Sequence, residues 1–194
     1  MFRKIKYLLN SMVHRASLRD IWSAVRFFWL SGDRSNLVFA SAGILVFSLV
    51  GLAIHFTIDS QHQSRELRCL ALNIYHEARG EPDEGKYAVA KVTLNRVASR
   101  HYPKTICEVV YQKRWDYLRN RYVSAFSWTE LDERPVASNT RAWLKAARIA
   151  QEVFDNPAGQ NLKGALFYHA RHIRPSWARK KIRVARIGRH IFYQ

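Results

Sequence analysis

One long stretch of the chain contains almost no polar side chains. Between Leu37 and Ile58 there is no Asp, Glu, Lys or Arg, and a single histidine stands near the end. At about 1.5 Å per residue, a helix over this stretch spans the hydrocarbon core of a bilayer. A buried helix of this length in a soluble protein would show a polar face. The pattern therefore predicts a transmembrane helix over residues 37–58, in contact with membrane lipid.

A cleaved signal peptide is the competing interpretation of this segment. The leader before it is longer than thirty residues and carries charges throughout, whereas a signal peptide has a short charged region before its apolar core. No small-x-small cleavage site follows Ile58. The segment is therefore expected to remain as an anchor.

Residues 1–36 form a basic segment that sets the expected orientation. Seven Lys or Arg residues precede the anchor, and the positive-inside rule then places the N-terminus in the cytoplasm and the rest of the chain on the periplasmic or cell-wall side of the inner membrane. Apolar residues recur at helical spacing over residues 18–29. They fit an amphipathic helix in the membrane interface as well as they fit a basic flank of the anchor.

After the anchor, apolar positions recur first at helical spacing and later at strand spacing. Residues 59–65 are polar and are expected to form a tether to a single domain over residues 66–194. Helices first and strands last predict an α+β domain. Caps, Gly, Pro and apolar periodicity predict helices over residues 66–78, 83–99 (capped by Asp83), 105–112 and 139–154 (capped by Asn139), an irregular region over 113–138, and strands over 165–169 and 184–193.

The net charge of +17 restricts the partners but does not select one. Residues 59–194 carry 25 Lys or Arg against 13 acidic residues. A domain this basic favours polyanionic surroundings, which include nucleic acid, anionic lipid headgroups and a cell wall rich in carboxylate and phosphate.

The two cysteines, Cys69 and Cys107, both follow the anchor. Two isolated cysteines cannot provide the four ligands of a structural zinc site. In an oxidising compartment they are expected to form a disulfide, and the alternative is two buried free thiols.

Glu77 is the most informative candidate for catalysis, because it falls in the last turn of a predicted helix beside a loop. Burial and the negative end of the helix dipole both raise the pKa of a carboxyl group, which could then donate a proton. A lone Glu at a helix end is nevertheless a surface residue more often than a catalyst. The pair His76-Glu77 begins like the zinc motif His-Glu-x-x-His, but position 80 is glycine, so no metal site is expected.

An ordered series of motifs resembles the SleB-type cell-wall hydrolase family over essentially all of residues 66–193. The series includes Asn73-Ile74-Tyr75-His76-Glu77-Ala78-Arg79-Gly80-Glu81-Pro82, then Asn95-Arg96-Val97, Gly164-Ala165-Leu166-Phe167-Tyr168-His169-Ala170, and Ile187-Gly188-x-His190-x-Phe192-Tyr193. The resemblance implies a compact lysozyme-like α+β domain that cleaves the bond between N-acetylmuramic acid and N-acetylglucosamine in peptidoglycan. It also implies that Glu77 is the catalytic residue.

A single acid is sufficient if the enzyme is a lytic transglycosylase. Glu77 would protonate the glycosidic oxygen and then accept the proton of the sugar's 6-hydroxyl, whereas a hydrolase would need a second carboxylate. Glu81, Asp83 and Glu84 are the nearby candidates for that carboxylate. Glu81 is expected either to contact substrate or to act as the starting acid of the next helix.

The resemblance suggests further substrate-binding residues and no cofactor. Tyr168 and His169 match the family's strand motif and are expected to line the cleft, the alternative being a core tyrosine beside a satisfied histidine. Ser127 and Trp128 stand where the family has a Gln-Phe-Ser-Trp-like segment, although Ala125 replaces the glutamine.

The chief alternative is a catalytically inactive basic module that binds cell wall or another polyanion. The basic run over residues 179–186 favours it. Nucleic acid is not an expected partner, because no recognised nucleic-acid motif is present.

Overall fold

The computed structural model describes residues 22–23, 25–27, 34–117, 119–130, 140–157 and 162–194. The chain divides into two compact units, residues 1–58 and 59–194, which are considered separately. Of the expected interfacial helix, residues 22–23 and 25–27 lie within the described part and are helical.

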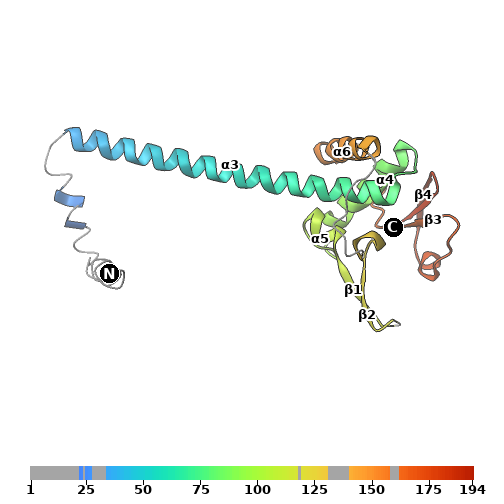
Figure 1. Ribbon diagram of the computed structural model, residues 1–194. Helices are drawn as coiled ribbons and strands as arrows, with labels where there is room; N and C mark the ends of the chain where they lie inside the picture. Colours follow the sequence, from blue (N-terminus) through green and yellow to red (C-terminus); the bar gives the residue numbers. More distant parts are fainter. Residues whose placement is uncertain (1–21, 24, 28–33, 118, 131–139, 158–161) are drawn as a thin grey trace, which may run out of the picture. The chain divides into compact units, whose positions relative to one another are not determined.

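Helix α3 (Arg34–Ala78) contains the one described stretch long and apolar enough to cross a membrane. Its apolar side chains over residues 37–58 are almost all exposed, as expected of a surface that faces lipid. Residues 59–65, expected as a tether, are helical and belong to α3 (Figure 1). Polar side chains do not prevent a helix here, since this stretch contains no Gly or Pro.

The helical half of the second unit packs around the end of α3. Figure 1 shows α4 (Asp83–Ala98), α5 (Ile106–Val110) and α6 (Thr140–Asp155) gathered near that end. Leu70 and Ile74, four positions apart on one face of α3, are completely buried. The core around them also contains Tyr75, Ala90, Val110, Trp128, Ile149 and Val153.

Two predicted helix starts differ from the structure or fall outside it. Pro82, not Asp83, occupies the N-cap position of α4, and no side chain caps it. The Asp83 carboxylate instead pairs with Lys145 at 3.0 Å and with Lys86 at 3.3 Å. The predicted cap of α6, Asn139, lies outside the described residues.

A small antiparallel sheet of order β3-β5-β4 closes the domain, which confirms the α+β prediction. Its strands are β3 (Phe167–Ala170), β4 (Arg183–Ile187) and β5 (His190–Tyr193), and the 3-10 helix η2 (Ser176–Lys180) lies between the first two. The single strand predicted over 184–193 is a hairpin. The chain reverses at Gly188, whose φ of 56° is accessible to glycine without strain.

Part of the region predicted to be irregular is ordered. Strands β1 (Lys113–Asp116) and β2 (Arg121–Ser124) form an antiparallel hairpin, and the 3-10 helix η1 (Ser127–Glu130) follows. Most side chains of this hairpin are exposed. No apolar alternation was therefore present to indicate two strands in the sequence.

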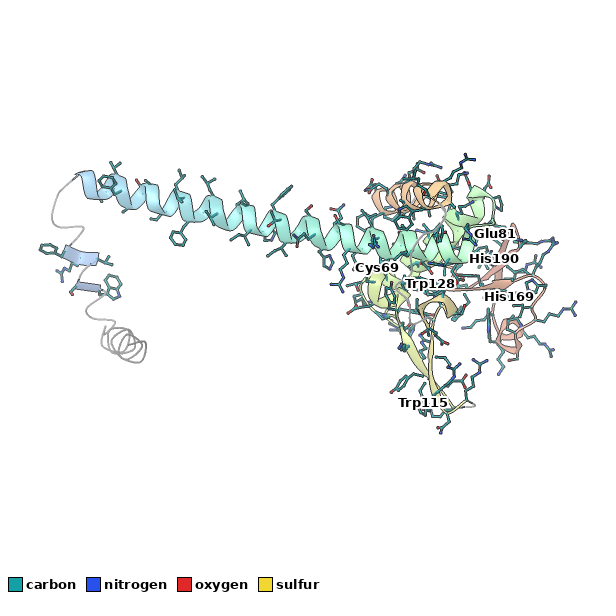
Figure 2. All side chains as sticks on the ribbon, in the orientation of Figure 1. Cys69, Glu81, Trp115, Trp128, His169 and His190 are labelled. Atoms are coloured by element: carbon teal, nitrogen blue, oxygen red, sulfur yellow. A yellow bond between two sulfur atoms is a disulfide. The ribbon has the colours of Figure 1, made fainter. Side chains whose placement is uncertain are left out.

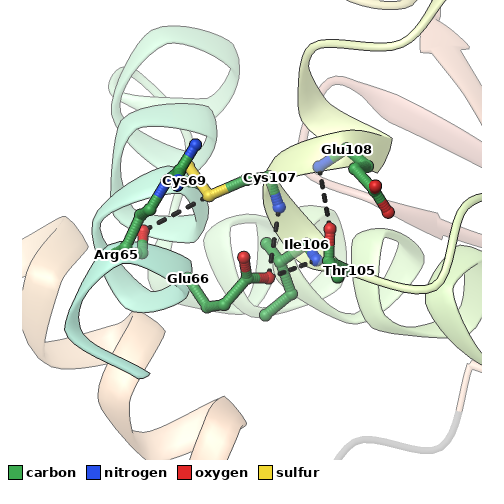
Figure 3. Close-up of a disulfide and its surroundings, with 7 residues drawn as sticks. All are labelled: Arg65, Glu66, Cys69, Thr105, Ile106, Cys107 and Glu108. Atoms are coloured by element: carbon green, nitrogen blue, oxygen red, sulfur yellow. Dashed lines mark hydrogen bonds between the residues drawn. A yellow bond between two sulfur atoms is a disulfide. The ribbon is translucent and has the colours of Figure 1, made fainter. Parts of the chain in front are cut away.

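A disulfide joins Cys69 of α3 to Cys107 of α5, as predicted (Figure 3). Beside it, the Glu66 carboxylate accepts hydrogen bonds from the backbone N–H groups of Ile106 and Cys107. The Thr105 hydroxyl accepts another from Glu108 N at 3.2 Å. These acceptors satisfy the free N–H groups that open a helix, so α5 is fixed to α3 covalently and through its N-terminus.

Candidate active site

Glu77 lies in the last turn of α3, half-buried, with its carboxylate facing the sheet. The Tyr168 hydroxyl donates a hydrogen bond to Glu77 Oε2 at 3.1 Å, across 91 positions of sequence. Burial raises the pKa of Glu77, and although the Tyr168 hydrogen bond and the Arg96 charge lower it, the pKa remains above its ordinary value. The carboxyl group is therefore biased toward the protonated form, as a general acid requires.

Tyr168 is held as a neutral hydrogen-bond donor. Burial raises the pKa of its phenol well above the ordinary value, and the adjacent Glu77 carboxylate raises it further. Arg96 of α4 lies behind the pair, where its Nε donates to the Leu166 carbonyl at 2.9 Å. Its guanidinium also packs against the rings of Tyr102 and Phe126, at 5.5 and 5.4 Å from their centres. This cation is fixed by its contacts and acts on Glu77 through space.

His76 and Trp128 form a rigid stacked pair beside Glu77. Their ring centres are 4.6 Å apart with an interplanar angle of 17°. Trp128 Nε1 donates to Asn73 Oδ1 at 3.3 Å, and the amide of Asn73 donates to Thr93 Oγ1 at 3.1 Å. Burial, and then the charge of Arg79, lower the pKa of His76. Trp128 is therefore a buried part of this network, whereas Ser127 next to it is exposed.

Glu81 occupies a different environment from Glu77, and Figure 2 shows it close to His190. Its side chain is only 3% exposed, and both oxygens are bound: Arg189 N donates to Oε2 at 2.8 Å and Arg189 Nε to Oε1 at 2.7 Å. His190 Nδ1 is 3.8 Å from Oε2. Burial alone would raise the pKa of Glu81, but the Arg189 hydrogen bonds and the neighbouring charges outweigh it and lower the pKa. Glu81 thus ties the loop after α3 to the turn between β4 and β5.

His169 and Tyr168 point to opposite faces of the sheet, as consecutive residues of a strand must. His169 stacks on Tyr193, with ring centres 5.3 Å apart, and its Nε2 lies 3.0 Å from the Tyr193 hydroxyl. Its Nδ1 lies 2.9 Å from the carbonyl of Ala170. The structure therefore brings Tyr168 to Glu77 and places His169 on the outer face.

Within the described part of the chain, no group of three or more His, Cys, Asp or Glu residues is arranged to hold a metal ion. His76 Nε2 is buried and lacks a hydrogen-bond partner among the described residues, but Trp128 covers the ring.

Residues 80–193 match the family described as Cell Wall Hydrolase, which is more than half of the chain. The chain belongs to the cell wall hydrolase family. The matched range begins three residues after Glu77, so the match does not itself include that residue.

Curated relatives of this cell wall hydrolase are spore cortex-lytic enzymes. The chain is 31% identical over 138 residues to the enzyme of Oceanobacillus iheyensis and 30% identical over 136 residues to that of Bacillus cereus. Each alignment covers 70% of this chain, but 44% and 46% of the relatives. The chain therefore spans less than half the length of the curated relatives it matches.

A solved structure shares the fold of the hydrolase domain. It is the catalytic domain of the germination-specific lytic transglycosylase SleB from Bacillus anthracis, with a TM-score of 0.53 and 26% identity. The similarity covers 66% of this chain and 93% of that domain. The part of this cell wall hydrolase that shares the fold thus corresponds to nearly all of that solved domain.

Several residues of the hydrolase site were not singled out from the sequence. Arg96 and Arg189 lie in or beside the quoted motifs, at Asn95-Arg96-Val97 and in the gap of Gly188-x-His190. Asn73 opens the longest motif, three positions before His76. Their positions in these motifs were the available signal, but the partners they contact lie far away in sequence.

Proposed function

We propose that this cell wall hydrolase cleaves the glycan strands of peptidoglycan at the bond between N-acetylmuramic acid and N-acetylglucosamine, with Glu77 as general acid and base. The hydrogen bond from Tyr168 to Glu77 carries the proposal, together with the burial that raises the pKa of Glu77. A carboxyl group with a raised pKa that is oriented and partly accessible is suited to donate a proton to a leaving oxygen.

The surroundings of the other acids favour a lytic transglycosylase over a hydrolase. Glu81 is bound through both oxygens by Arg189, and Asp83 is engaged by Lys145 and Lys86. Neither is free to activate water, which leaves Glu84 as the exposed candidate among the three. A hydrolase needs a second carboxylate in addition to the acid.

The reaction then needs no group beyond Glu77 and the sugar. Glu77 donates its proton to the glycosidic oxygen as the bond from that oxygen to C1 of the muramic acid breaks, and the substrate's N-acetyl group stabilises the positive charge at C1. The 6-hydroxyl oxygen attacks C1 and returns its proton to Glu77. The product ends in a 1,6-anhydro ring, no water is consumed, and Glu77 is restored. Tyr168 orients the carboxyl group throughout.

The other residues that were expected to bind substrate have different roles in this proposal. Exposed Ser127 is available for hydrogen bonds to sugar. Trp128 supports His76 and, through it, the segment that carries Glu77. Glu81 holds the loop after α3 in place by its bonds to Arg189.

We propose further that α3 anchors the enzyme in the inner membrane as a single span. The basic residues of the segment 1–36 support a cytoplasmic N-terminus, and the disulfide supports an oxidising compartment for the domain. The domain would then face the peptidoglycan on the periplasmic or cell-wall side.

The test compares wild type, Glu77→Gln and Glu108→Gln, all full-length in detergent, on purified peptidoglycan, with mass spectrometry of the released fragments. Glu108→Gln is a matched control, because Glu108 is exposed in the first turn of α5. We expect wild type and Glu108→Gln to release fragments ending in 1,6-anhydromuramic acid, and Glu77→Gln to release them at least about 100-fold more slowly.

Each other outcome contradicts a named part of the proposal. Undiminished release by Glu77→Gln removes Glu77 as the acid. Fragments with a reducing muramic acid end indicate hydrolysis, and a loss of activity in Glu84→Gln would then identify the second carboxylate. Binding without release by wild type favours the inactive wall-binding module.

A further inference from the structure

The outer face of the β3-β5-β4 sheet carries a pocket that the reaction at Glu77 does not use. Its volume is about 480 Å³. Three arginines, Arg171, Arg174 and Arg179, line it together with His169 and Tyr193. The strand register explains its separation from Glu77: Tyr168 pairs with Phe192 toward the core, while His169 pairs with Ile191 on the other face.

The pocket lies in a part of the chain without acidic residues. Residues 156–194 contain nine Lys or Arg and no Asp or Glu. Arg189 is paired with Glu81, but the described residues offer no ion-pair partner to Arg171, Arg174 or Arg179. Three guanidinium groups that share one pocket repel each other unless an anion joins them.

The aromatic wall of the pocket is rigid. His169 stacks on Tyr193, and the edge of Trp177 contacts both rings, with centre distances of 5.6 Å in each case. The Ala170 carbonyl can only accept, so its contact with His169 requires Nδ1 to carry the proton. An aromatic wall beside arginines suits a ligand that presents a carboxylate next to an apolar or planar group.

We propose that this pocket binds carboxylates of the peptide side chains of peptidoglycan. The inference rests on the proposed function, because it takes peptidoglycan as the substrate. The glycan backbone itself is uncharged at its sugars, and the free carboxylates of the polymer are carried by the peptides attached to muramic acid. Arginine recognises a carboxylate through two parallel N–H donors, which a phosphate-free polymer can satisfy only through its peptides. The enzyme then holds its substrate on one face of the sheet and cleaves it on the other.

The test measures binding of full-length protein in detergent to insoluble peptidoglycan, either intact or after its free carboxylates have been converted to neutral methylamides with a carbodiimide and methylamine. All proteins carry Glu77→Gln so that cleavage does not release them. The test variant is Arg171→Gln/Arg174→Gln/Arg179→Gln. The control, Arg65→Gln/Arg68→Gln/Arg100→Gln, removes the same charge from exposed arginines outside the sheet that carries the pocket.

We expect the test variant to bind intact peptidoglycan about tenfold more weakly than the control, because it lacks three guanidinium groups that can pair with carboxylates. On the amidated peptidoglycan the two variants should bind equally. Equal binding of the two variants to intact peptidoglycan would overturn the proposal. So would an equal loss on amidated peptidoglycan, or a defect seen only in a parallel binding assay with vesicles that contain phosphatidylglycerol.

The same measurements distinguish an error in the proposed function from an error in the assignment of this pocket. If the protein without Glu77→Gln neither binds nor cleaves intact peptidoglycan, the substrate assignment itself is wrong. If it cleaves normally while the test and control variants bind alike, only the assignment of this pocket is wrong.

Discussion

Glu77 and Glu81 stand four positions apart, yet their surroundings give them opposite chemistry. Glu77 contacts a neutral phenol, and burial raises its pKa. Glu81 is more deeply buried, but Arg189 binds both of its oxygens and its pKa is lowered. Desolvation is the largest influence on both carboxyl groups, so the partner decides the outcome. A buried carboxylate with a full set of charged donors stabilises the fold, and one with a single neutral donor remains available for proton transfer.

The largest expected change in stability comes from disturbing the contact between Glu81 and the turn at Gly188. A Cβ at position 188 would collide with Glu81 Oε2, and a residue with a Cβ would be strained by the positive φ of this position. Gly188→Ala should therefore lower the free energy of unfolding by about 3 kcal/mol, from backbone strain plus the disturbed Arg189 bonds. Denaturant unfolding measures this effect.

Gly164→Ala is the control for backbone strain alone. Gly164 also has a positive φ, of 68°, but the nearest atom to an added Cβ is Gln194 Nε2 at 3.7 Å. It should cost about 1 kcal/mol. Equal costs at the two positions would mean that the contact between Glu81 and the turn does not stabilise the domain.

A smaller effect is expected when Glu77 is replaced. Since the folded pKa of Glu77 is raised, its contribution to stability is fully present below the unfolded pKa and is lost as pH rises through the folded pKa. Glu77→Gln removes this loss. The variant should match wild type at acidic pH and become more stable than wild type above the folded pKa of Glu77.

Unfolding curves measured across the acidic to neutral range check this expectation. If Glu77→Gln instead became less stable relative to wild type as pH rises, the folded protein would favour the ionised form of Glu77. The comparison with Glu81 would then fail, because both carboxyl groups would be stabilised as anions.

The smallest expected effect concerns the hydrogen bond from Tyr168. This bond favours the charged form of Glu77 and lowers its pKa, so Tyr168→Phe should raise the pKa. The alkaline limb of kcat/KM for peptidoglycan cleavage then moves to higher pH, while the rate falls only several-fold. Tyr87→Phe removes a phenol that bonds Glu152 and should leave the limb in place. A shift to lower pH in Tyr168→Phe would contradict the assigned contact.

Local pattern predicted the helices of the domain better than its sheets. The end of α3 at Ala78 was correct because Gly80 and Pro82 follow it, and the extent of α4 was correct to within one residue. The hairpin of β1 and β2 was missed because its exposed strands lack alternation. The reversal at Gly188 was missed because one glycine separates two strands of similar composition.

In the candidate site too, local motifs indicated some residues, whereas contacts between distant parts of the sequence were not predictable. Glu77 could be singled out as a candidate because it belongs to a compact motif at a helix end. Its partner Tyr168 was expected near the cleft, but the contact spans 91 positions and depends on how the sheet packs on α3. The only local signal for Arg189 was its place between Gly188 and His190 in the motif, because its role comes from the turn at Gly188 that brings its backbone and side chain to Glu81.

The Cys69–Cys107 disulfide has a consequence for folding if the domain is exported as proposed. Closing a loop over 38 positions contributes about 4 kcal/mol on the chain-entropy model, a large part of the roughly 5–15 kcal/mol that stabilises a domain. Cytosolic thiols stay reduced. With the proposed orientation, a newly synthesised chain therefore reaches full stability only after its C-terminal part has crossed the membrane. Copies that fail to cross would be the ones most readily degraded by cytosolic proteases.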